Sequence, residues 1–191
     1  MSAPSYKTRQ RGTTMVEVLV TLIIVAIGLL GVVGLQARLQ SSELESYQRS
    51  QAIVLLDDVA SRISSNRHFA ANYETTAANP LGAGMACPVN GGLPTRQQID
   101  TAEWCTALQG AAEVAAGTNS GAMIGARGCV ETLPGNEYLI TVAWQGVTPL
   151  TAPPASVACG ANLYDGPPSS TCTADRCRRV VTTIVRIAQL N

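Results

Sequence analysis

The segment RGTTMVEVLVTLIIVAIGLLGVVGLQ, Arg11 to Gln36, decides the fold of this chain. Residues Val18 to Leu35 carry no charge. At a rise of about 1.5 Å per residue such a helix covers about 27 Å, close to the roughly 30 Å hydrocarbon core of a bilayer. Apolar side chains occupy all sides of this helix rather than one stripe, unlike a surface helix. We therefore predict a membrane-spanning helix at about residues 18–37.

Charge gives the orientation of this helix. Lys7, Arg9 and Arg11 precede it, whereas all 13 acidic residues follow Gly12. By the positive-inside rule residues 1–12 stay in the cytoplasm and the rest of the chain is exported. No basic patch interleaved with aromatic residues is present, so the sequence does not indicate a nucleic-acid partner.

The helix is expected to continue beyond the membrane, over residues 13–67. No proline occurs between Ser5 and Asn79, and no glycine between Leu35 and Leu81. From residue 38 to 67 the pattern becomes amphipathic, and its apolar residues share one face at 100° per residue. These residues are Leu44, Ala52, Leu55, Leu56, Val59 and Ile63. We expect this face to cover the head and to settle in a bundle of neighbouring helices.

Residues 68–191 are expected to form one globular head with a small antiparallel sheet. Residues 69–95 read as an irregular loop. Apolar residues spaced by three and four predict a second helix in residues 97–113, with Ile99, Ala102, Cys105, Leu108 and Ala112 on one face. Alternating or β-branched segments predict strands at 127–133, 137–146 and 178–190, with Val181, Val185 and Ile187 inward. The fold class is α+β: a long N-terminal helix packed on a small sheet.

Six cysteines lie beyond the apolar segment: Cys87, Cys105, Cys129, Cys159, Cys172 and Cys177. An even number confined to the exported part favours disulfides in an oxidising compartment. The sequence does not choose among the possible pairings, although Cys172 and Cys177 are close enough in the chain to be the best candidate pair. The alternative, a metal site, needs more ligands than one C-x4-C segment supplies, and His68 is the only histidine. We expect no metal and no cofactor.

The segment RGTTMVEVLVTLIIVAIGLLG resembles the type III signal of type IV prepilins. The resemblance implies that a dedicated peptidase cuts after Gly12 and methylates the new N-terminal amine of Thr13. It also makes Glu17 the fifth mature residue, where pilins carry a glutamate that pairs with the N-terminal ammonium of a neighbouring subunit. Thr13 departs from the phenylalanine that is usual in the family.

Glu17 has a second interpretation, because Thr14-Met15-Val16-Glu17 also fits a capping box and a carboxylate in the first turn is favoured by the helix dipole. The glycines Gly28, Gly31 and Gly34 likewise allow two interpretations: close packing against other helices, or simple tolerance in lipid.

Later segments resemble the minor pilins of the pilus modification protein family (PilV). The match runs through YQRSQAIVLLDDVASRISSNR, in which Asp58, Arg62 and Asn66 fit a D-x-A-x-R-x-x-x-N pattern, and through IDTAEWCTAL, GARGCVE and RRVVTTIVR. Residues 111–126 and the six cysteines depart from the family.

The resemblance implies a minor pilin that helps to start type IV pilus assembly in a tip or priming complex and supports twitching motility and adhesion. Its partners would be other minor pilins, the major pilin, the prepilin peptidase, the inner-membrane assembly platform and a tip adhesin. Two alternatives stay open: a minor pseudopilin of type II secretion, and a signal-anchored periplasmic binding module. The sequence shows no nucleophile-base arrangement around His68 and no phosphate loop, so we do not expect an enzyme.

Overall fold

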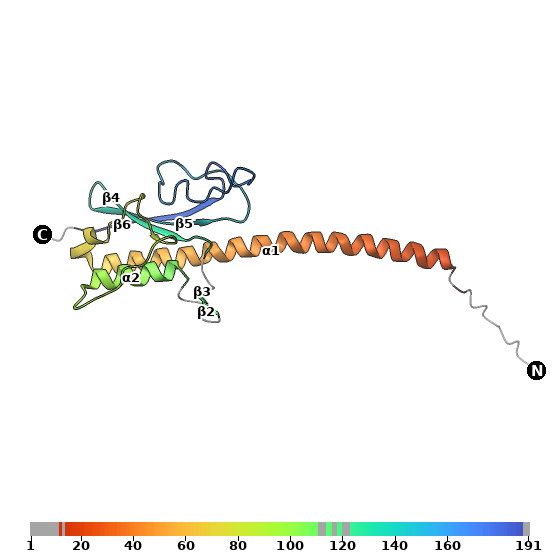
Figure 1. The fold of residues 1–191 in the computed structure, drawn as a ribbon, viewed down its shortest axis with the longest axis horizontal. Coiled ribbons are helices and arrows are strands. Elements are labelled where there is room, and N and C mark those ends of the chain that lie inside the picture. Colours follow the sequence, from red (N-terminus) through yellow and green to blue (C-terminus); the bar gives the residue numbers. More distant parts are fainter. Residues whose placement is uncertain (1–11, 13, 111–113, 116–117, 120–122, 189–191) are drawn as a thin grey trace, which may run out of the picture. The chain divides into compact units, whose positions relative to one another are not determined.

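A computed structural model describes residues 12, 14–110, 114–115, 118–119 and 123–188 (Figure 1). The chain forms two compact units, Met1–Glu43 and Leu44–Asn191. The long helix α1 (Met15–Ser65) belongs to both, and the other elements belong to the second unit. These are the 3₁₀ helix η1 (Arg67–Tyr73), helix α2 (Arg96–Leu108) and strands β1 (Leu81–Gly82), β2 (Val114–Ala115), β3 (Thr118–Asn119), β4 (Arg127–Leu133), β5 (Glu137–Gln145) and β6 (Arg178–Arg186).

The head contains a four-stranded antiparallel sheet in the order β1-β4-β5-β6. The register places Val130 opposite Ile140 and Val142 opposite Val181, so that these apolar side chains share one face of the sheet. In the head, α2 and the end of α1 lie on one side of the sheet, and the chain between β5 and β6 lies on the other (Figure 1). The predicted α+β, pilin-like architecture is confirmed.

The core lies between this sheet face and the head part of α1. Ala52, Leu56, Val59 and Ile63 of α1 are buried, together with Ile140 of β5. Val181 and Val185 of β6, and Ile187 directly after the strand, were predicted to face inward; all three are partly buried and pack against the same core. A sheet of this size cannot bury one face alone, and the helix supplies the cover.

This burial corrects one expectation about α1. Ala52, Val59 and Ile63 are sealed in the chain's own core and Leu55 is half-buried, so these residues are not available to a bundle of neighbouring helices. Of the predicted face only Leu44 is exposed, at 55%. The apolar face fits the head because both belong to one folding unit, and intramolecular packing uses it first.

Two further expectations need correction. The stretch predicted as a loop contains η1 and the short strand β1. Helix α2 begins at Arg96 with a capping box formed by Thr95 and Gln98, and it ends at Leu108. It ends there because Gly110 adopts a positive φ of 82°, which no continuing helix accommodates. Ala112 lies outside the described residues.

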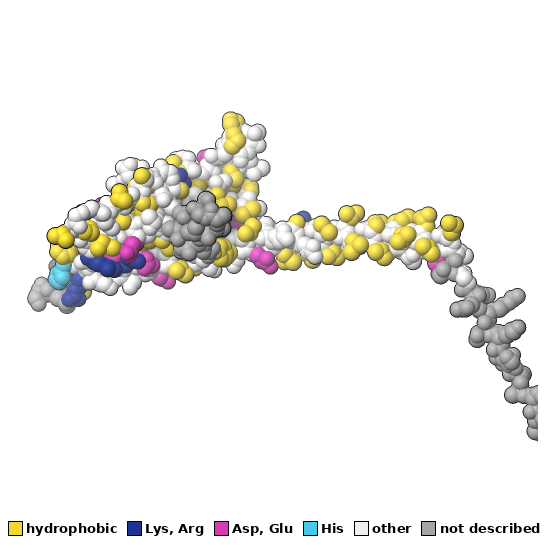
Figure 2. Space-filling view, turned by 60° about the horizontal axis from the view of Figure 1, so that its bottom comes forward, with side chains coloured by type: hydrophobic (Ala, Val, Ile, Leu, Met, Phe, Trp, Pro, Cys, Tyr) yellow, Lys and Arg dark blue, Asp and Glu magenta, His cyan; other side chains and the backbone are white. Residues whose placement is uncertain are grey.

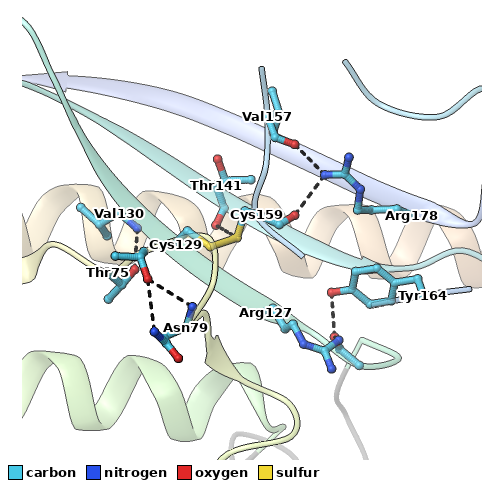
Figure 3. The surroundings of a disulfide bond; sticks show 12 residues. Thr75, Asn79, Arg127, Cys129, Val130, Thr141, Val157, Cys159, Tyr164 and Arg178 are labelled. Atoms are coloured by element: carbon cyan, nitrogen blue, oxygen red, sulfur yellow. Dashed lines mark hydrogen bonds between the residues drawn. A yellow bond between two sulfur atoms is a disulfide. The ribbon is translucent and has the colours of Figure 1, made fainter. Parts of the chain in front are cut away.

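Three disulfides brace the head: Cys87–Cys105, Cys129–Cys159 and Cys172–Cys177. The last is the pair that the sequence favoured. Cys129 lies on β4 and Cys159 in the long β5–β6 connection, so this bond fixes the connection to the outer face of the sheet (Figure 3).

Polar contacts of the connection reinforce this attachment. Buried Arg178 donates from Nη1 to the carbonyl oxygens of Val157 and Cys159 at 2.7 and 3.1 Å. The hydroxyl of Tyr164 donates to the Gly125 carbonyl at 2.9 Å. The guanidinium of Arg127 lies over the Tyr164 ring, 5.0 Å from the ring centre. The connection is therefore part of the folded head, although it has no regular secondary structure.

Candidate functional site

The residues predicted for peptidase processing and docking lie at the start of α1. Gly12 is exposed, and a Cβ added there would meet no other atom within 4 Å. Thr13 lies outside the described residues. The helix starts at Met15, and the backbone N–H groups of Glu17 and Val18 donate to the Thr14 carbonyl at 3.0 and 3.3 Å. Glu17 is therefore in the first turn, where the helix dipole favours a negative charge.

The side chain of Glu17 is exposed and has no partner among the described residues. Neither it nor the Thr14 side chain makes a hydrogen bond or ion pair there, so the capping box that the sequence allows is not formed. The carboxylate is thus accessible at the edge of an otherwise apolar surface.

That surface extends along the first unit of α1. Its large apolar side chains from Met15 to Leu39 are all exposed, and Figure 2 shows them covering this part of the helix with few charges between them. The most apolar window of 18 residues has a mean hydropathy of 3.0 and no buried residue. Length and composition make this helix a candidate membrane span. An added Cβ at Gly28, Gly31 or Gly34 would meet nothing within 4 Å, which leaves both interpretations of these glycines open.

A comparison with family models finds a match at the start of the chain. Residues 7–33 match the model of the prokaryotic N-terminal methylation motif. The segment is a type IV prepilin-like signal. No curated protein and no solved structure matches the chain.

The methylation motif indicates a class of protein. It indicates a type IV pilin-like or pseudopilin protein, and proteins with this motif are structural rather than catalytic. It implies a partnership with a prepilin peptidase and with pilus or secretion machinery. Together with the apolar helix it fits anchoring in the inner membrane.

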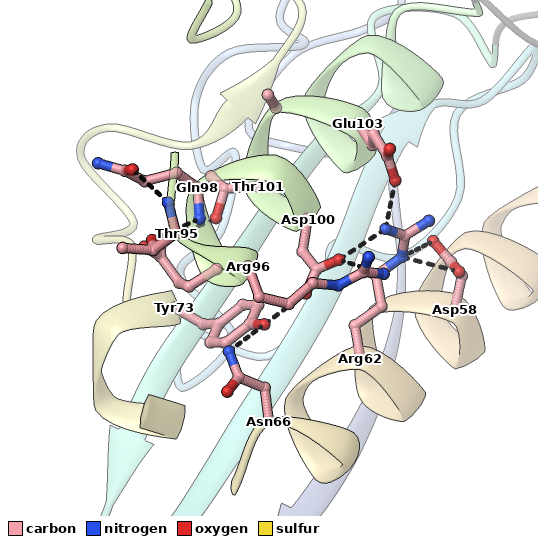
Figure 4. A network of polar contacts seen from close by, with 12 residues as sticks. Asp58, Arg62, Asn66, Tyr73, Thr95, Arg96, Gln98, Asp100, Thr101 and Glu103 are labelled. Atoms are coloured by element: carbon pink, nitrogen blue, oxygen red, sulfur yellow. Dashed lines mark hydrogen bonds and ion pairs between the residues drawn. The ribbon is translucent and has the colours of Figure 1, made fainter. Parts of the chain in front are cut away.

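At the other end of α1, Arg62 is the centre of a polar network (Figure 4). Its Nε lies 2.9 Å from Asp58 Oδ2, and its Nη1 lies 2.9 Å from Asp100 Oδ1 and 2.5 Å from Glu103 Oε2. Asp58 is on α1, whereas Asp100 and Glu103 are on α2. The guanidinium therefore joins the two helices of the head.

Asp100 is the buried member of this network, with a side chain that is 1% exposed. Besides Arg62 it contacts Arg96 at 3.0 Å and accepts a hydrogen bond of 2.5 Å from the Tyr73 hydroxyl. Asn66 donates to the same hydroxyl at 3.1 Å. A buried carboxylate needs such partners, and here they come from α1, α2 and η1.

The pKa shifts agree with a structural role of the network. Burial disfavours the charge of Arg62, but hydrogen bonds to Glu103, Asp58 and Asp100 outweigh it and raise the pKa of the guanidinium. Burial and the hydrogen bond to Asp100 raise the pKa of Tyr73 to about 12. At neutral pH both groups keep their protons, so they hold the helices together rather than exchange protons.

The described residues contain no group of three or more His, Cys, Asp or Glu side chains that could hold a metal ion. All six cysteines are in disulfides, and His68 lies in η1. The sequence did not reveal that Asp100 and Tyr73 are buried partners. The nearest signal was the IDTAEW segment, in which Asp100 and Trp104 are one helical turn apart.

Proposed function

We propose that this chain is a minor pilin, related to the pilus modification protein family (PilV), that takes part in starting type IV pilus assembly. It joins other minor pilins in a tip or priming complex, and in this way supports twitching motility and adhesion. The observation that carries the proposal is the methylation motif at residues 7–33, which includes the exposed apolar start of α1 with one carboxylate in its first turn.

The proposed mechanism begins with processing. Prepilin peptidase cleaves between Gly12 and Thr13 and methylates the amine of Thr13. Until docking, the mature subunit stays in the inner membrane as a single-pass protein. A carboxylate in lipid costs about 2.5–3.5 kcal/mol at a helix centre, and less near the interface, so Glu17 gains from a cationic partner.

Docking then pairs Glu17 with the N-terminal ammonium of a neighbouring subunit. At low effective dielectric this pair is favourable only when both charges arrive together, so it aligns the subunits in register. The exposed apolar residues before Leu44 pack in the filament, because those between Ala52 and Ile63 belong to the chain's own head. The subunit moves from the inner membrane into a pilus that crosses the periplasm to the cell surface.

The specific relation to the PilV family draws support from the head network. Asp58, Arg62 and Asn66, the residues that carry the resemblance, all take part in it. They meet Asp100 of the IDTAEW segment, and Trp104 of the same segment donates to the Leu55 carbonyl at 3.0 Å. Residues from two of the segments that resemble the PilV family thus attach α2 to α1.

The proposed partners are other minor pilins, the major pilin, the peptidase, the inner-membrane assembly platform and a tip adhesin. A minor pseudopilin of type II secretion is the second candidate, because the methylation motif fits both classes equally. Deletion of the gene separates the two: loss of twitching supports the pilin, and loss of secretion with normal twitching supports the pseudopilin.

The docking step is tested with Glu17→Gln, which keeps the shape of the side chain and removes its charge. Glu43→Gln is the matched control, since Glu43 is also an exposed glutamate on α1 but lies beyond the apolar segment. We expect both variants to enter the membrane, and only Glu17→Gln to lose piliation and association with other minor pilins. Normal piliation with Glu17→Gln would contradict the mechanism.

A further inference from the structure

The two edges of the head sheet differ in how far other segments of the chain cover their backbone groups. On the β1 side, the outer edge of β4 is sealed. Leu81 and Gly82 of β1 pair with it, and Ala83 N donates to the Ala126 carbonyl at 2.8 Å. Further along the same edge, Thr75 satisfies both backbone groups of Val130. The Thr75 N–H donates to the Val130 carbonyl at 2.8 Å, and the Thr75 hydroxyl accepts from Val130 N at 2.9 Å.

The opposite edge, strand β6, has no such cover among the residues that the structure describes. All nine residues of β6 pair with β5 on one side. Within the described residues, no backbone hydrogen bond joins Val180–Val185 to any other segment. The β5–β6 connection covers only the start of the strand, at buried Arg178. Further along, Thr182 and Arg186 are exposed, and Ile184 is 55% exposed.

Edge strands usually carry features that prevent pairing with another chain, such as proline, a bulge, an interrupting charge or short length. The central part of β6, VVTTIV at residues 180–185, has none of these and consists only of β-branched residues. Such residues have the highest strand propensity. The edge therefore offers a row of free N–H and C=O groups in a strand that is already held straight by β5.

The charge of the residues around β6 indicates what kind of segment pairs with its free edge. Residues 176–188 contain four arginines and no acidic residue. Three of these arginines already have acidic partners outside this segment, namely Asp175, Glu45 and Glu137. The Arg186 side chain is nevertheless 77% exposed, and exposed Arg176 makes no ion pair among the described residues. A second copy of β6 fits poorly, because antiparallel pairing centred on Thr182 sets Arg178 opposite Arg186, and like charges directly opposite are destabilising.

We infer that the free edge of β6 binds an extended, acidic segment of a partner protein by β-strand addition. Main-chain hydrogen bonds to Val180–Arg186 supply the affinity. Carboxylates near the ends of the segment meet Arg176 and Arg186, and an apolar side chain packs beside Ile184. This surface is separate from the N-terminal signal, so the inference stands or falls independently of the proposed pilin function.

The test uses the full chain in detergent and amide hydrogen exchange resolved to single residues. The probe is a short peptide of alternating valine and threonine with glutamate at both ends, and its control has lysine in place of glutamate. We expect the acidic peptide to slow exchange at alternate residues of β6, those whose N–H groups point away from β5. The lysine peptide should bind at least about tenfold more weakly.

Two variants locate the effect. Ile184→Glu should weaken binding of the acidic peptide about tenfold, because it adds charge repulsion and removes the apolar contact. Leu163→Glu is the control, a residue of similar exposure (48%) in the β5–β6 connection, and it should leave binding unchanged. The inference is overturned if the peptide gives no protection, or if both peptides bind equally. It is also overturned if protection appears without peptide as the protein concentration rises, which would identify a second copy as the occupant.

Discussion

Substitution of Gly128 by alanine tests how the head is held against α2. Gly128 lies on β4 directly beneath the Trp104 side chain of α2. A Cβ at this position would lie 2.4 Å from Cη2 and 2.7 Å from Cζ2 of Trp104, and 2.8 Å from Cδ1 of Leu108. Carbon atoms in normal contact are about 3.5–4.0 Å apart, so the ring would have to move by about 1 Å.

The ring has little freedom to move. Trp104 is 1% exposed, and its Nε1 donates to the Leu55 carbonyl at 3.0 Å. Overpacking of a core costs about 1–3 kcal/mol, and two rigid neighbours place Gly128→Ala near the upper end, at about 2–3 kcal/mol. For a domain of this size that corresponds to a decrease in Tm of about 5–10 °C.

The assay is urea unfolding of the full chain in detergent with disulfides intact, followed by the fluorescence of buried Trp144. Gly91→Ala is the control, because an added Cβ there meets nothing within 4 Å; it should be neutral or slightly stabilising. Trp104→Phe should cost less in the Gly128→Ala background than alone, with a coupling of about 1 kcal/mol or more. Equal stability of Gly128→Ala and wild type, or strictly additive effects, would refute this packing argument.

Three further predictions concern the network and the disulfides. Arg62→Met should lower the free energy of unfolding by about 2–3 kcal/mol, because buried Asp100 loses one of its cationic partners; an unchanged urea midpoint would contradict this. Since the pKa of Tyr73 is raised from 10.0 to about 12, its contribution to stability is present below pH 10 and lost as pH rises through about 12. With Tyr73→Phe, the urea midpoint should fall less steeply with pH over this range. An equally steep fall would exclude Tyr73 as the group responsible. Replacing Cys129 and Cys159 by serine opens a loop with a sequence separation of 30 and should cost about 3–4 kcal/mol in the same assay, whereas a loss below about 1 kcal/mol would show that the other contacts hold the loop.

The strands and helices could be predicted where periodicity is strong. The alternation in β5 and the β-branched run in β6 each require one pairing face, and the structure has both strands antiparallel with the expected residues inward. Strand β1 and helix η1 could not be predicted, since both are too short to show a period. Strand β1 exists because Leu81 and Gly82 meet an edge of β4, where their partners Gly128 and Arg127 lie 47 and 45 residues further along the chain.

The two candidate sites differ in the same way. The N-terminal site consists of consecutive residues, so the signal around Gly12 and Glu17 can be read directly from the sequence. The head network joins Arg62 to a carboxylate 38 residues away, at Asp100. Nothing in the spacing of charges along the chain predicts such a contact, because it depends on how α2 packs on α1. The same dependence hid the pairing of Cys87 with Cys105.

The most direct test of the central claim is the mass of the mature N-terminus, measured on protein isolated from cells that contain the prepilin peptidase. Processing of the methylation motif predicts a chain that begins at Thr13 with a methylated amine. A mature chain that still carries residues 1–12 would contradict the account, since its uncleaved leader would keep the N-terminal ammonium away from the Glu17 of any neighbour.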